Sequence, residues 1–177
     1  MEPKPYVVEL DPETNTLLKM YLFQNIQNLE VIRSNIIQGV WNCAAIKPNL
    51  IIEPFQVAVA ANRAVLSEKQ GALVTKTVFS EILYNLSLTR NITQSLTRFG
   101  IEKDPNLLIC FLVTDQSDAS KDILPQIEGE MLPMSDLNGF TCSKNLKSIY
   151  KLKDIPTHQD LTDVIVSRMV TKNFVTH

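Results

Sequence analysis

Cysteine, glycine and histidine are scarce in this sequence of 177 residues. Its three cysteines, Cys43, Cys110 and Cys142, form no C-x-x-C pair and have no histidine close by. We therefore expect neither a disulfide framework nor a zinc site, and a reducing compartment fits best. The five glycines stand far apart, which excludes a glycine-rich phosphate-binding loop, and no G-x-S-x-G nucleophile motif occurs. The sequence predicts a protein that uses no metal and no cofactor.

The chain also lacks long apolar runs and an excess of charge of one sign. No apolar run approaches the roughly 20 residues that span a bilayer, so no membrane partner is expected. Seventeen basic and nineteen acidic residues leave a net charge of −2, which excludes a strongly basic nucleic-acid-binding domain but not a local basic patch. Hydrophobic residues make up 45% of the chain, so we expect a packed, soluble, intracellular domain that comprises residues 1–177.

The spacing of apolar residues predicts a mixture of strands and helices. We expect strands over residues 6–10, 16–23, 49–52 and 106–114, with a further strand and turn over 129–137. We expect helices over residues 25–38, 54–70, 78–86, 91–100, 144–152 and 158–172, and a short helix that ends at 127. In the helix over 54–70, the inward face should hold Phe55, Ala58, Val59, Asn62, Val65 and Leu66. The predicted fold class is α/β (α+β), a single domain with a mostly antiparallel sheet packed with several helices.

Residues suited to catalysis are few. His177 is the last residue of the sequence, and His158 stands at an expected helix start, where a solvated residue is more common than a general base. The acidic pair Glu128 and Glu130 falls on an expected loop and is better explained as a solvated turn. We therefore predict no catalysis by this chain alone.

Local charge is more informative than total charge. From Ala61 to Arg98 the chain has five basic and two acidic residues, a local balance of +3. On spacing alone these basic side chains are best explained as solvated. The alternative is phosphate binding next to the helix that Asn91 is expected to cap, since free backbone N–H groups and the helix dipole favour anions there.

Three segments carry a resemblance to a known family. One begins at Ile51 with I-I-E-P-F-Q-V-A-V-A-A-N-R-A-V, and a second runs from Ser80 to Ile101 as S-E-I-L-Y-N-L-S-L-T-R-N-I-T-Q-S-L-T-R-F-G-I. The third, S-I-Y-K-L from Ser148 to Leu152, precedes a closing helix with D-V-I-V-S-R-M-V-T-K-N. In order and spacing these segments resemble the PRPK-binding protein family, the small subunit that accompanies the atypical kinase of the KEOPS (EKC) complex.

The resemblance implies a single α/β domain that performs no chemistry itself. It implies that the chain binds the N-terminal lobe of the small PRPK-type kinase and contacts other KEOPS subunits indirectly. The complex makes N6-threonylcarbamoyl-adenosine next to the anticodon of tRNA, in the cytoplasm and nucleus. The resemblance further implies that the chain grips the single-stranded CCA end of tRNA. The runner-up function is a kinase-regulating protein that binds no RNA.

Site residues follow from the resemblance position by position. Kinase binding is carried to Phe99 and Ile101, and tRNA binding to Lys76, Arg90, Asn91 and Arg98. Other roles remain open: Phe99 and Ile101 as core residues at a helix end, Asn91 as an N-cap, and Glu81 as an ion-pair partner of Lys76 or Arg90.

Two departures from the family weaken the tRNA assignment. Several relatives have a second basic residue where this chain has Val74, and others have a proline in place of Leu88. Arg90 offers a compensating charge, since archaeal-type members have an arginine near that position.

Overall fold

A computed structural model describes residues 4–152 and 158–175 of the chain. At its centre is a sheet with the strand order β1-β2-β4-β3, in which β5 also pairs with β2, and these pairings are all antiparallel. The strands are β1 (Tyr6–Glu9), β2 (Leu17–Gln24), β3 (Ala44–Ile46), β4 (Leu107–Val113) and β5 (Glu130–Leu132). The predicted single α+β domain with a mostly antiparallel sheet is confirmed.

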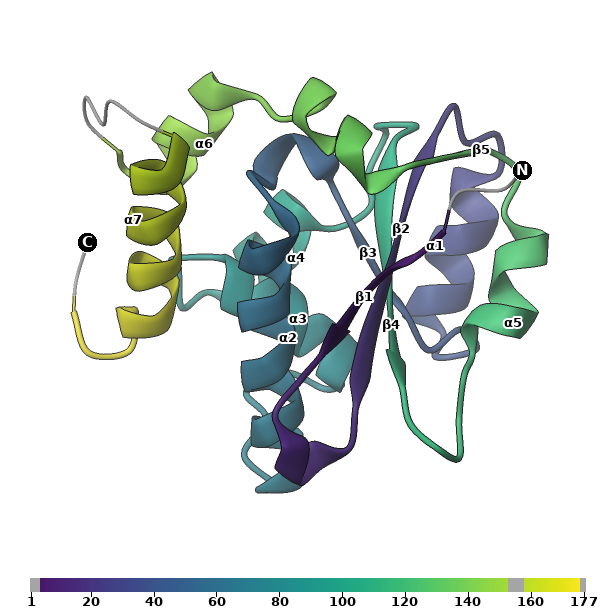
Figure 1. The fold of residues 1–177 in the computed structure, drawn as a ribbon, viewed down its shortest axis with the longest axis horizontal. Helices are drawn as coiled ribbons and strands as arrows, with labels where there is room; N and C mark the ends of the chain where they lie inside the picture. Colours follow the sequence, from purple (N-terminus) through teal and green to yellow (C-terminus); the bar gives the residue numbers. More distant parts are fainter. Residues whose placement is uncertain (1–3, 153–157, 176–177) are drawn as a thin grey trace.

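Helices cover both faces of the sheet (Figure 1). On one side lie α1 (Leu29–Ile37) and α5 (Ser120–Ile123), and on the other α2 (Pro54–Lys69), α3 (Val78–Leu86), α4 (Ile92–Phe99) and α7 (His158–Thr171). The helix α6 (Ser143–Ile149) lies near α7. Short 3-10 helices occur at Pro12–Thr14, Pro48–Leu50, Leu124–Gln126 and Met134–Gly139.

Burial on both faces explains why β4 is almost wholly apolar. Leu108 and Cys110 belong to the core on the side of α2, α3, α4 and α7. Leu107, Ile109 and Phe111 belong to the core on the side of α1 and α5. Successive side chains of a strand alternate between its faces, so one strand serves two cores.

The strand expected over residues 49–52 is wrong. The third strand lies earlier, at Ala44–Ile46, and Pro48–Leu50 forms a 3-10 turn in which Ile51 N donates to Pro48 O at 3.2 Å. Pro48 has no N–H to donate to a neighbouring strand, and its fixed φ suits the first turn of a helix.

The start of α1 and the buried face of α2 differ from expectation. The helix α1 begins at Leu29 and not at 25, because Asn25 has a φ of 54° and Ile26 N donates to Pro105 O at 2.9 Å. The helix α2 begins at Pro54 as predicted, but the expected burial of Phe55 is wrong, since this side chain is 53% exposed.

Gln56 takes the inward position next to Phe55 and is completely buried. Its Oε1 accepts from Ile52 N at 2.8 Å, and its Nε2 donates to Leu50 O at 3.2 Å and to Tyr150 Oη at 2.8 Å. These bonds satisfy a polar side chain that hydrophobic periodicity assigns to the surface.

Candidate functional site

The side chain assigned to kinase contact at Phe99 lies inside the molecule. Phe99 is the last residue of α4, is completely buried, and packs with its ring centroid 6.2 Å from that of Tyr150. Ile101 is half-buried and packs into the other core, on the side of α1 and α5. The core alternative therefore describes Phe99, whose side chain is inaccessible to a partner in this fold, while Ile101 keeps part of its surface exposed.

Gly100, between these two residues, is required by close packing. Its N–H donates to Leu96 O at 2.9 Å, and a Cβ at this position would collide with that same carbonyl oxygen. Its φ of −83° is ordinary, so the absence of a side chain is what this backbone approach needs. Packing at the C-terminal end of α4 therefore explains the F-G-I segment.

A buried carboxylate organises the α2–α3 loop (residues 72–77). Glu81, in the first turn of α3, is 2% exposed. Its carboxylate accepts from Val74 N at 3.0 Å and from both the N–H and the hydroxyl of Thr75 at 2.8 Å. The expected ion pair of Glu81 with Lys76 or Arg90 does not form among the described residues, because the carboxylate faces the loop backbone.

Thr77 begins α3 with a capping box. Its Oγ1 accepts from Ser80 N at 3.1 Å, and Ser80 Oγ accepts from Thr77 N at 3.1 Å, so two N–H groups at the helix end are satisfied. Lys76, immediately before this cap, is exposed. The capping box and Glu81 together fix the backbone that carries Lys76.

A buried lysine organises the α3–α4 loop (residues 87–91). Lys172 follows α7 and is 3% exposed. Its Nζ donates to the backbone oxygens of Tyr84, Ser87 at 3.0 Å, and Thr89 at 3.3 Å, and it lies 3.4 Å from the centroid of the Tyr84 ring. One ammonium thus supplies hydrogen-bond donors to carbonyls at and just beyond the C-terminal end of α3.

Burial and neighbouring charges together set the pKa of Lys172. Burial, helped by the positive charges of Arg63 and Arg90, lowers the pKa of Lys172 from 10.5 to about 8, and Glu81 opposes this shift. Tyr84 shares the site, and burial with the nearby Glu81 charge raises the pKa of its hydroxyl, against the opposing effect of Arg90. At neutral pH the site therefore holds a protonated lysine beside a protonated tyrosine.

Two arginines hold the C-terminal end of α7 in place. Arg90 donates from Nε at 3.3 Å and from Nη2 at 3.0 Å to Lys172 O, and Arg63 of α2 donates from Nη1 to Met169 O at 3.1 Å. Cations favour the negative end of a helix dipole, so both contacts support the docking of α7. Arg90 nevertheless remains exposed.

Asn91 is the N-cap of α4, as one of its two alternatives predicted. Its Oδ1 accepts from Gln94 N at 3.0 Å, and its own N–H donates to Thr89 Oγ1 at 3.1 Å. The first turn of a helix still presents its other N–H groups outward, here those of Ile92 and Thr93.

The four residues assigned to tRNA are spread along two helices. Arg90 and Asn91 are adjacent in the α3–α4 loop, but Arg98 is in the last turn of α4, which has 8 residues and so measures about 12 Å. Lys76 precedes α3, whose 9 residues measure about 14 Å. The structure therefore brings Arg90 and Asn91 together and separates them from Lys76 and Arg98, all on exposed positions.

The role of Lys172 is absent from the sequence-based assignments. The sequence contains one indication that Lys172 is buried. Lys172 follows Ile165 and Met169 at helical spacing, and both of these residues are completely buried. A lysine that continues an apolar stripe indicates a buried partner, although the sequence does not say which carbonyls it meets.

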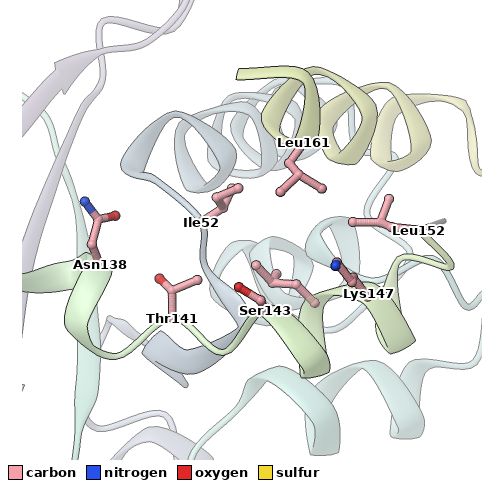
Figure 2. A pocket seen from close by; sticks show the side chains of 8 residues that line it. Ile52, Asn138, Thr141, Ser143, Lys147, Leu152 and Leu161 are labelled. Atoms are coloured by element: carbon pink, nitrogen blue, oxygen red, sulfur yellow. The ribbon is translucent and has the colours of Figure 1, made fainter. Parts of the chain in front are cut away.

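A small pocket of about 180 Å³ lies between α6 and α7 (Figure 2). Ile52 and Leu161 point toward it from facing elements, and Lys147 supplies an amine at its edge. Its lining comprises Ile52, Asn138, Thr141, Ser143, Leu146, Lys147, Leu152 and Leu161. Lys147 is the one ionisable residue among these eight, so the lining of the pocket contains no acid–base pair.

Of the three cysteines, Cys43 and Cys110 are buried and Cys142 is half-buried. Burial raises the pKa of Cys43 to about 12, and burial together with Cys43 raises that of Cys110, so both thiols are protonated at neutral pH. Over residues 4–152 and 158–175, no group of three or more His, Cys, Asp or Glu side chains is arranged to hold a metal ion. Over the same ranges, no helix has both the length and the apolar character needed to cross a bilayer.

Comparison with known proteins gives a consistent family. A family model described as kinase binding protein CGI-121 matches residues 23–173. The EKC/KEOPS complex subunit TPRKB of Danio rerio is 30% identical over 158 residues, which cover 86% of this chain and 89% of that protein. The EKC/KEOPS complex subunit CGI121 of Yarrowia lipolytica is 27% identical over 157 residues, which cover 86% of this chain and 90% of that protein. The EKC/KEOPS complex subunit CGI121 of Candida glabrata is 32% identical over 117 residues, which cover 64% of this chain and 65% of that protein.

Proposed function

The chain belongs to the CGI-121 family of kinase-binding proteins, and we propose that it is a non-catalytic accessory subunit of an EKC/KEOPS complex. In this role it binds and regulates the small kinase of the complex, in the cytoplasm and nucleus. The observation that carries the proposal is a family match from β2 through α7, together with relatives that are named as EKC/KEOPS subunits.

We further propose that the chain helps recruit tRNA through its single-stranded CCA end. Three exposed cations, Lys76, Arg90 and Arg98, lie along α3 and α4, and the N-terminus of α4 adds outward N–H groups next to Arg90. Phosphate oxygens accept hydrogen bonds from such groups whatever the base sequence. Because the cations are spread over two helices, each would meet a different phosphate of an extended strand.

The second candidate function is kinase regulation without RNA binding. Val74, where the family resemblance leads us to expect a basic residue, is 53% exposed and adds no charge to this surface. Arg90 also donates two hydrogen bonds to Lys172 O, so these two nitrogens stabilise the fold and are not available to RNA. Both observations favour a weak or absent RNA contact, so RNA binding needs its own test.

The kinase proposal is tested by co-purification of the full chain with the kinase of its own complex. Wild type should form a stable complex, and Ile101→Glu should weaken it, since a charge at the centre of a desolvated contact costs several kcal/mol. Val40→Glu is the control, because Val40 is 64% exposed beyond α1. Absence of a wild-type complex refutes the proposal, and a folded Ile101→Glu variant that still binds tightly refutes the assignment of Ile101.

The RNA proposal is tested by fluorescence anisotropy with tRNA at several salt concentrations. Two or three neutralised phosphates predict a log–log salt slope of about −1.4 to −2.1, at roughly −0.7 per phosphate of a single strand. Lys76→Ala with Arg90→Ala should flatten this slope. The matched control is Arg33→Ala with Lys121→Ala, which removes the same two residue types from exposed positions on α1 and α5. The RNA proposal is refuted if transcripts with and without CCA bind equally well, or if Lys76→Ala with Arg90→Ala has no effect. Kinase binding is then the remaining proposed function.

A further inference from the structure

Lys172 is a cation that the chain buries at the junction of α7 and the α3–α4 loop. Taking an ammonium out of water is costly unless its donors find acceptors. Here all three donors do, at the backbone oxygens of Tyr84, Ser87 and Thr89. A lysine satisfied in this way is a specific connection between two parts of the chain and not a solvated side chain.

The connection is reciprocal. The side chain of Lys172 donates to Thr89 O, and the side chain of Arg90 donates back to Lys172 O from two nitrogens. The two contacts hold neighbouring residues of the α3–α4 loop, and Asn91 follows directly as the N-cap of α4. The position of Arg90 therefore depends on the last residues of the α7 segment.

The same arrangement leaves part of Arg90 available. Nε and Nη2 are used on Lys172 O, whereas Nη1 has no hydrogen-bonded partner within residues 4–152 and 158–175. Its guanidinium is thus oriented at one edge and presents the other edge from an exposed residue. An oriented guanidinium loses less conformational entropy when it binds an oxyanion.

We propose that Lys172 is a positioning residue for RNA binding, which holds the α3–α4 loop so that Arg90 and the N-terminus of α4 meet one phosphate of a single-stranded RNA end. The inference rests on the proposed RNA role. It adds that α7, which contains none of the residues assigned to tRNA, determines the geometry of the contact. Lys172 itself touches no phosphate, because its donors are already occupied.

The test uses Lys172→Met, which keeps the length of the side chain and removes its charge and its three hydrogen bonds. The matched control is Lys69→Met, which makes the same substitution at a lysine whose Nζ donates to Glu13 O, outside both α7 and the α3–α4 loop. Three measurements are made on the full chain: hydrogen exchange of residues 87–91, anisotropy with tRNA, and co-purification with the kinase.

Lys172→Met should exchange faster across residues 87–91 and bind tRNA about tenfold more weakly, equivalent to about 1.4 kcal/mol, while it keeps the kinase. Lys69→Met should leave the loop and the RNA affinity unchanged. Equal RNA affinity of Lys172→Met and wild type overturns the inference, and so does an equal loss in Lys69→Met. If wild type itself binds no RNA, the proposed RNA role fails and the inference falls with it; if wild type binds and Lys172→Met binds equally well, the inference alone fails.

A second measurement covers the case in which Lys172→Met does not fold. Raising the pH from 7 to 9 deprotonates Lys172 in the wild-type chain, since its pKa is lowered to about 8. The charged and titratable groups that face it are Arg63 from α2, Glu81 and Tyr84 from α3, and Arg90 from the loop. Burial and the Glu81 charge raise the pKa of Tyr84 from 10, so its hydroxyl keeps its proton in this window while Lys172 loses one. RNA affinity should fall through pH 8 with faster exchange of residues 87–91, and a flat profile overturns the inference.

Discussion

The hydroxyl of Tyr150 offers a sharp test of how the core is held together. It donates to Leu86 O at 2.6 Å and accepts from Gln56 Nε2 at 2.8 Å, and all three residues are completely buried. Burial raises the pKa of this hydroxyl, which keeps its proton available for Leu86 O. Tyr150→Phe removes one oxygen and leaves two buried groups unpaired, the carbonyl of Leu86 and the one N–H of the Gln56 amide that does not donate to Leu50 O. At about 1–3 kcal/mol for each such group, we expect a loss of about 2–6 kcal/mol in the free energy of unfolding.

The measurement is urea denaturation of Tyr150→Phe beside Tyr6→Phe, which loses a hydroxyl from a 40% exposed residue at the edge of the sheet. The control should stay within about 0.5 kcal/mol of wild type. A double-mutant cycle with Gln56→Leu should give a coupling energy between about 0.5 and 3 kcal/mol, because the two side chains share a hydrogen bond. If Tyr150→Phe changes stability no more than Tyr6→Phe does, the network is not a source of stability.

Two further predictions concern buried ionisable groups. Glu81→Gln removes the charge and replaces one of the two oxygens that accept from Val74 N with an NH₂ donor. Stability should therefore fall by about 1–3 kcal/mol in urea denaturation, with faster exchange of residues 72–77; unchanged exchange would contradict the anchoring role of Glu81. Cys43 and Cys110 should stay unreactive to a thiol reagent at pH 8 while half-buried Cys142 reacts, since burial raises the pKa of both buried thiols; three thiols reacting at one rate in the folded chain would refute this.

Elements with local signals could be predicted from the sequence. The helices α2, α3 and α4 begin at Pro54, after Thr77 and after Asn91, within a residue of expectation, because proline and capping side chains act on their immediate neighbours. The strand β4 was also predictable, since burial on two faces leaves an uninterrupted apolar run. The third strand was missed because Ala44–Ile46 is short and the apolar run after Pro48 gives the stronger signal.

The site was harder to predict because its residues depend on distant parts of the fold. Phe99 packs against Tyr150, so two segments of the family resemblance meet in the core. A sequence segment that identifies the family can therefore contain core residues as well as residues of a binding surface. Similarly, the partners of Gln56 and Lys172 lie up to 94 residues away in sequence, beyond the reach of periodicity.

The helix α3 shows how buried charges organise the surface that we propose for RNA. Glu81 in its first turn binds the backbone of the loop that carries Lys76, and Lys172 at its other end binds the backbone of the loop that carries Arg90. Each charge has the sign that the helix dipole favours at that end. Because each also satisfies backbone groups, replacing either should displace one cationic loop and leave the other in place. An exchange measurement on Glu81→Gln and Lys172→Met together should therefore show two separate regions of faster exchange, residues 72–77 and 87–91; a merged change across all of α3 would mean that the helix itself, and not the loops, depends on these charges.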